Sequence, residues 1–201
     1  LFWLERIWPV LRTGLSFLES FHSEPHPLGL PSHDLWEERM GIHAYSLGAV
    51  SAAFRTGAYF AGQLGERALG SRYLKSARNI ERLLAEHFFA GDEWVRRSYV
   101  VSSAEFSRLG NEAPGAFLGN GYWDELPDTS LLGLITPFRL IAPGSARARA
   151  IVTRVRESLW NRQVGGLHRY ERDSRLLIHR NEIFPVNSPT QQSKGGPSLS
   201  H

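Results

Sequence analysis

The chain has 201 residues, of which 42% are hydrophobic and 21% charged, and its formal net charge at pH 7 is +3. This composition is typical of one globular domain with an ample core. The sequence has no cysteine, which excludes disulfides and thiolate metal sites. No apolar run approaches the roughly 18 residues of a membrane span, and no nucleic-acid-binding motif accompanies the arginines. We therefore expect neither a membrane nor a nucleic acid as a partner.

The first predicted element is an amphipathic helix over residues 1–22, in which Pro9 is expected to cause a kink or a break. Its apolar side chains recur every three or four residues, at Leu4, Ile7, Trp8, Leu11, Leu15 and Leu18. Prolines between residues 23 and 31 end this helix. Two further helices are expected over residues 43–64 and 66–89. The earlier of these is rich in small side chains that let another helix approach closely, so we expect it to be buried.

The rest of the chain is predicted to form shorter elements separated by loops. Residues 93–101 carry β-type side chains and favour a short strand or a hairpin arm. Glycine, proline and asparagine between residues 110 and 127 favour a loop. The remaining elements are two helices over 129–141 and 145–159, an extended piece over 167–170, and a disordered tail over 187–201. This succession predicts an all-α fold with a short β segment, whose loops carry the chemistry.

The most informative segment is Gly29-Leu-Pro-Ser-His-Asp-Leu-Trp-Glu-Glu-Arg-Met-Gly-Ile-His43. It combines the carboxylates of Asp34, Glu37 and Glu38 with the indole of Trp36. This combination suits a carbohydrate, because an aromatic ring stacks on a sugar face while a carboxyl group protonates the glycosidic oxygen. In the alternative interpretation Asp34 caps the following helix and Glu37 completes a capping box, so that the acids are structural.

This segment resembles the general-acid segment of glycoside hydrolase family 15, which includes glucoamylases and glucodextranases. The resemblance implies about half of an (α/α)6 toroid, and hydrolysis of terminal α-glucosidic bonds of glucans or oligosaccharides with inversion. Glu37 matches the general acid, and its carboxylate neighbours are a physical reason for it to keep its proton near neutral pH. Asp34, Trp36 and Glu38 match residues that contact the sugar or tune the acid. The implied reaction needs no cofactor and no metal ion.

Two later segments match the same family in the same order. Asp128-Thr-Ser-Leu-Leu-Gly133 resembles a helix start of the family, and Asp128 acting as an N-cap explains it without a catalytic role. Arg169-Tyr-Glu-Arg-Asp173 resembles a motif whose arginine reaches substrate hydroxyls, so Arg169 is a candidate substrate-binding residue. The alternative for Arg169 is a surface salt bridge with Asp173.

The chain also departs from the family pattern. His33 stands where the family commonly has an aromatic residue, and a loop or cap role is the alternative for both His33 and His43. The family's general base is a glutamate in a Glu-Gln pair, and no such pair includes the late glutamates Glu157, Glu171 and Glu182. We therefore predict that residues 1–186 form a partial catalytic domain, that the base lies outside this chain, and that the isolated chain is inactive.

Two other classes of protein stay open at this point. One is a non-catalytic glucan-binding or regulatory helical module, and the other is a helical scaffold in which the acids only cap a helix. Proteins with this motif handle α-1,4, α-1,6 and α,α-1,1 linkages alike, and nothing in the sequence indicates an oligomeric state. The absence of cysteine and of a visible signal peptide slightly favours the cytoplasm, although a start without methionine inside a predicted helix is typical of a fragment.

Overall fold

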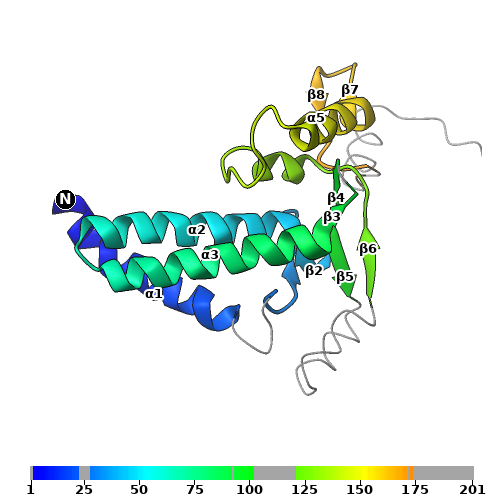
Figure 1. The fold of residues 1–201 in the computed structure, drawn as a ribbon. Helices are drawn as coiled ribbons and strands as arrows, with labels where there is room; N and C mark the ends of the chain where they lie inside the picture. The colour runs from blue at the N-terminus through cyan, green and yellow to red at the C-terminus, as the bar shows by residue number, and fades with distance from the viewer. Residues whose placement is uncertain (1, 23–27, 92, 102–120, 172, 174–201) are drawn as a thin grey trace, which may run out of the picture. The chain divides into compact units, whose positions relative to one another are not determined.

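The computed structural model describes residues 2–22, 28–91, 93–101, 121–171 and 173 (Figure 1). The chain divides into two compact units, Leu1–Glu171 and Arg172–His201, and all described helices and strands lie in the first unit. The predicted tail and the predicted domain boundary at residue 186 lie outside the described residues. The described part is mostly helical and carries a small sheet, so the prediction of a helical protein with a β segment is confirmed at that level.

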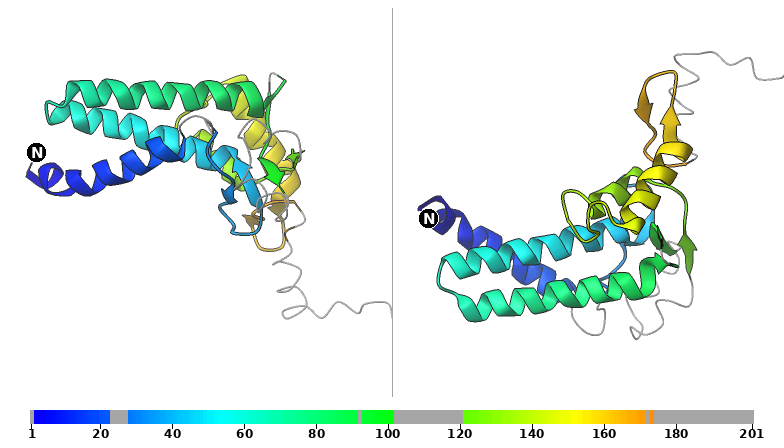
Figure 2. Two further views of the ribbon diagram at one scale, coloured as in Figure 1. Left: turned by 90° about the horizontal axis from the view of Figure 1, so that it is seen from below. Right: turned by 45° about the horizontal axis from the view of Figure 1, so that its top comes forward.

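Three long helices, α1 (Phe2–Phe21), α2 (Ala44–Gln63) and α3 (Arg67–Phe88), run along one another, with α2 packed against both neighbours (Figure 2). Their bounds agree with the predicted ones to within one residue. The expected burial of α2 is confirmed, and its small residues explain the close packing: a Cβ atom added at Gly57 would lie 2.5 Å from a methyl carbon of Leu15 on α1. Helix α1 continues through Pro9, so of the two predicted effects of this proline the break is wrong and the kink stays a prediction.

Four short antiparallel strands form a sheet where α2 begins and α3 ends (Figure 1). In sheet order they are β1 (Ser32–His33), β2 (Met40–His43), β5 (Ser98–Val101) and β6 (Gly121–Asp124). The predicted strand within residues 93–101 is confirmed, whereas β6 lies in a segment predicted as loop. Pairing with β5 explains this difference. The two strands approach so closely at Gly121 that a Cβ atom there would lie 2.3 Å from the Val100 carbonyl oxygen. Gly121 therefore allows close approach of two strands rather than a turn.

The remaining elements are short, apart from one helix. They are the hairpins β3 (Phe89–Ala90) with β4 (Trp94–Val95) and β7 (Trp160–Asn161) with β8 (Gly166–Leu167), the 3-10 helix η2 (Thr129–Leu134), and helix α5 (Ala146–Leu159). Helix α5 confirms the prediction over 145–159, and the Ser145 hydroxyl caps it by accepting from the Ala148 N–H at 3.2 Å. The predicted helix over 129–141 is wrong beyond η2, because Pro137 has no N–H and blocks a continuing helix. No helix of the described residues is long and apolar enough to cross a membrane.

Candidate active site

The acidic segment forms the loop of a β-hairpin. Strands β1 and β2 pair antiparallel, and residues 34–39 connect them. Oδ1 of Asp34 accepts hydrogen bonds from the backbone N–H groups of Trp36 at 3.1 Å and Glu38 at 2.9 Å. The Asp34 backbone N–H in turn donates to the Arg39 carbonyl at 2.9 Å. Asp34 therefore holds the shape of the loop, as aspartates do in tight turns.

This geometry shows that the capping-box interpretation is wrong. Helix α2 begins at Ala44, and its N-cap residue is His43, whose side chain makes no capping hydrogen bond. Strand β2 separates Asp34 and Glu37 from that helix, so neither carboxylate reaches its first N–H groups. Asp34 and Glu37 therefore owe their position to the hairpin loop and not to a helix cap.

Glu37 lies exposed in the hairpin loop, and its backbone has a conformation that residues other than glycine rarely adopt. Its φ is +58°, in the left-handed region, which costs an L-residue about 1–2 kcal/mol. Among the described residues, no side chain donates a hydrogen bond to its carboxylate. Backbone strain of this kind is often found at functional sites, where the surrounding structure enforces it.

The two residues that flank Glu37 are each tied to distant segments. The Trp36 indole N–H donates to both carboxylate oxygens of Asp128, at 3.2 and 3.1 Å. Glu38 accepts from the Arg169 guanidinium at 3.0 Å through Oε1 and from the Tyr170 hydroxyl through Oε2. The structure thus brings together all five predicted site residues: Asp34, Trp36, Glu37, Glu38 and Arg169.

A buried charge network lies beneath this loop. The Arg97 side chain is 3% exposed and donates to Asp128 at 2.8 Å and to Asp124 at 2.7 Å. Arg39 adds a second cation, 3.7 Å from the same Asp124 oxygen. The guanidinium carbons of Arg39 and Arg97 each lie 4.9 Å from the centre of the Tyr170 ring, within cation–π range. Every member of the network therefore has a charged or aromatic partner, as buried charges require.

Sequence analysis missed Arg97 and Asp124, and it gave Asp128 only the role of an N-cap. That capping role is confirmed, because Asp128 accepts from the Ser130 N–H at 2.6 Å. Its additional bonds to Trp36 and Arg97 had no local signal, since both partners are far away in the sequence. Tyr170 belongs to the Arg169–Asp173 segment that resembles the family, and its pairing with Glu38 gives it a place in the site.

The two histidines of the hairpin differ in environment. His33 on β1 is exposed, whereas His43 is buried. The His43 ring bridges two strands: Nε2 donates to the Ser32 carbonyl at 2.9 Å, and Nδ1 lies 2.7 Å from the Ser98 hydroxyl, from which it accepts when the ring is neutral. This arrangement suits the neutral imidazole. Burial lowers the pKa of His43 below its ordinary value of 6.5, although the bond to Ser32 opposes this shift.

We expect His43 to make folding sensitive to acid. The pKa of His43 lies below 6.5 in the folded chain. At a pH between the folded-state and unfolded-state pKa values, His43 is therefore protonated in the unfolded chain and neutral in the folded chain. The free energy of unfolding is therefore highest above pH 6.5 and falls below it, by at most about 1.4 kcal/mol per pH unit from this residue. Urea unfolding from pH 7.5 to 5 should show a shallower slope for His43→Gln than for wild type. His33→Gln is the matched control, and an equal change of slope in both variants would contradict the assignment.

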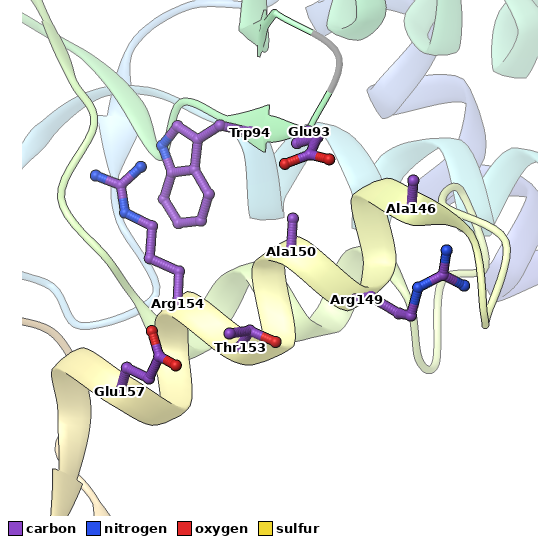
Figure 3. Close-up of a pocket in the computed structure, with 8 residues that line it drawn as sticks. All are labelled: Glu93, Trp94, Ala146, Arg149, Ala150, Thr153, Arg154 and Glu157. Carbon is purple, nitrogen blue, oxygen red and sulfur yellow. The ribbon is translucent and has the colours of Figure 1, made fainter.

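A separate hollow of about 500 Å³ lies between α5 and the start of β4 (Figure 3). Trp94 closes one side, and the Arg154 guanidinium carbon lies 3.9 Å from its ring centre. The ionisable side chains around it are Glu93, Arg149, Arg154 and Glu157, and all of them are exposed. No predicted site residue lines this hollow, so the hairpin is the candidate site. The part of the chain that the structure describes holds no group of three side chains able to bind a metal ion.

An exposed carboxyl group beside a fixed tryptophan and an arginine–glutamate pair is a set of groups suited to a glycosidase. The family model described as "Glycosyl hydrolases family 15" matches residues 4–137, more than half of the chain. The chain therefore belongs to glycosyl hydrolases family 15.

Relatives of this chain are longer proteins. An uncharacterized glycosyl hydrolase of Methanocaldococcus jannaschii is 26% identical over 170 residues, which cover 85% of this chain and 24% of that protein. A solved structure of a glycosidase variant matches with 21% identity and a TM-score of 0.49, and the match covers 72% of this chain and 32% of the glycosidase chain. The corresponding wild-type glycosidase matches with 22% identity and a TM-score of 0.48, covering 71% and 32%. The chain thus spans about a quarter of the length of the curated relative.

Proposed function

We propose that this chain supplies the general acid of an inverting α-glucosidase, and that Glu37 is that acid. One observation carries the proposal: of the three clustered acids, Glu37 alone extends into solvent, while Asp34 and Glu38 are engaged by the protein. A general acid needs a carboxyl group that reaches the leaving oxygen unhindered. Family membership and the family's general-acid segment support the same residue.

The neighbouring residues take distinct parts in this proposal. Trp36 stacks on the sugar through the ring face opposite the Arg169 guanidinium, whose carbon lies 5.4 Å from the ring centre, because the only indole N–H is bonded to Asp128. Glu38 and Arg169 form a half-buried pair that faces sugar hydroxyls with one acceptor group and one donor group. Asp34 contributes to substrate binding by fixing the loop that carries the other residues.

Hydrolysis with inversion also requires a carboxylate that activates water on the opposite sugar face, roughly 6.5–9.5 Å from the acid. Adjacent residues lie on one side of the bond, so Glu38 does not serve. None of the late glutamates stands in a Glu-Gln pair: Glu157 lies on α5 in the separate hollow (Figure 3), Glu171 directly follows Tyr170, and Glu182 is outside the described residues. We propose that the base belongs to another part of the whole protein and that the 201-residue chain alone does not hydrolyse glucosides.

The test compares this chain with a protein that joins it to the rest of a family 15 catalytic domain. Hydrolysis of maltose by the joined protein, and none by the chain alone, is the expected result. The second candidate is a glucan-binding module without catalysis, which Trp36 and the Glu38–Arg169 pair favour because such groups can bind a sugar without a base. A joined protein that binds maltose and releases it unchanged would establish that alternative instead.

The complete (α/α)6 toroid is likewise a proposal, and the surface of α1 supports it. Its apolar side chains Phe2, Trp3, Val10 and Phe17 are exposed. An apolar groove of about 450 Å³ runs between α1 and α2, lined by Val10 and Phe60 among others. Exposed apolar patches of this kind mark surfaces that other elements cover. In a toroid, neighbouring helices would pack there.

We therefore expect the isolated chain to self-associate through α1. Val10→Glu places a charge in the groove and should shift the chain toward its monomer mass of 22.7 kDa in sedimentation analysis. Val164→Glu is the matched control, because Val164 is 75% exposed like Val10 but lies in the β7–β8 turn. A monomeric wild-type chain, or equal effects of both variants, would contradict this use of α1.

A further inference from the structure

The Trp36 indole is held by a carboxylate that is itself buried and hydrogen-bonded to further donors. Asp128 is 1% exposed and accepts the indole N–H through both oxygens, at 3.2 and 3.1 Å, although the two residues are 92 positions apart. It also accepts from the Ser130 N–H at 2.6 Å and from Arg97 at 2.8 Å. Donors from three residues restrain the orientation of this carboxylate.

Asp128 is also joined to the segment that holds Glu38. It forms a β-bridge with Tyr170, and the next residue, Thr129, donates to the Arg169 carbonyl from its backbone N–H at 2.8 Å and from its hydroxyl at 2.9 Å. The residues on both sides of Glu37 are therefore anchored to one frame: Trp36 through Asp128, and Glu38 through Arg169 and Tyr170.

We propose that Asp128 is a positioning residue of the active site, which fixes the ring of Trp36 and, through it, the adjacent Glu37. A glutamate whose backbone has a left-handed conformation, as Glu37 does, persists only where the surrounding structure enforces that conformation. Two anchored neighbours provide this constraint. The bond to Asp128 also uses the only hydrogen that the indole can donate, so Trp36 meets a ligand with its ring alone. The role in sugar contact rests on the function proposed above.

The experiment follows the indole N–H resonances of the 201-residue chain by NMR. Trp36 is assigned by the loss of its signal in Trp36→Phe, and Trp94, whose indole donates to the Glu125 carbonyl at 3.2 Å, is the internal reference. Asp128→Ala should accelerate hydrogen exchange of the Trp36 indole about tenfold or more and leave Trp94 unchanged. Asp128→Asn keeps one carbonyl oxygen and should give a smaller acceleration. It also carries the test if the alanine variant does not fold.

A double-mutant cycle then separates positioning from a merely structural role. Maltose is the probe, titrated against wild type, Asp128→Ala, Trp36→Phe and the double variant. Asp128→Ala should weaken maltose binding about three- to tenfold when Trp36 is present and less than about twofold in the Trp36→Phe background. The lost bonds to Ser130 and Arg97 destabilise the chain equally in both backgrounds.

Each outcome decides one of the two proposals. Unchanged indole exchange in both Asp128 variants, or equal losses of maltose affinity in both backgrounds, would overturn the positioning role. A wild-type chain whose resonances respond to none of maltose, isomaltose and trehalose, which carry the three linkages left open, would count against the proposed sugar site. In that case indole exchange still decides whether Asp128 fixes Trp36.

Discussion

Glu37→Gln is expected to lower maltose hydrolysis about 10²–10⁴-fold in a protein that carries this chain within a complete family 15 catalytic domain. Glutamine keeps the length of the side chain but has no proton to give to the leaving oxygen. Because no side chain among the described residues bonds to the Glu37 carboxylate, the free energy of unfolding should stay within about 0.5 kcal/mol of wild type. Initial rates and urea unfolding of the same preparations check both parts.

Two further variants test whether the effect belongs to Glu37. Glu93→Gln changes an exposed glutamate of the hollow beside α5 and should retain full activity (Figure 3). Glu38→Gln loses an ion pair with Arg169 and should raise KM more than it lowers kcat. Substantial activity in Glu37→Gln would refute the general-acid role, and so would a rate loss fully explained by unfolding.

Arg97→Met is expected to lower the free energy of unfolding by about 3–5 kcal/mol. The arginine bridges Asp124 and Asp128 at 2.7 and 2.8 Å, and all three side chains are buried. Removing the cation leaves two carboxylates that are shielded from water and lack their main positive partner. Urea unfolding at pH 7 measures the loss, which is a large share of the stability of an ordinary domain.

The adjacent arginine provides the matched control for this prediction. Arg96 forms a 3.0 Å ion pair with Glu125, whose side chain is exposed, so Arg96→Met should cost only about 1 kcal/mol. Adding Asp124→Asn and Asp128→Asn to Arg97→Met should recover part of the lost stability, because the unpaired charges are then gone. Equal losses for Arg96→Met and Arg97→Met would show that the buried network does not stabilise the fold.

The acidic hairpin shows where prediction from sequence reaches its limit. The five residues predicted for the site were recognisable, because Asp34, Trp36, Glu37 and Glu38 lie within five positions of one another and Arg169 lies in the Arg-Tyr-Glu-Arg-Asp segment, whereas Arg97 and Asp124 gave no local signal. The setting of the acids was not recognisable, since Asp34 and Glu37 also have the spacing of a capping box. Strand β1 contains only two residues, too few for an alternating pattern, and it exists because β2 and β5 pair beside it.

The sequence by itself determined the three long helices, the residues of the acidic hairpin and the family, because helical periodicity and neighbouring motif residues are local properties. Only the tertiary structure decided how the acids are divided between structural and exposed roles. That division depends on Asp128, Arg97 and Tyr170, which reach the loop from segments far along the chain. Burial and charge pairing act between neighbours in space, and no periodic pattern in the sequence records which distant residues become neighbours.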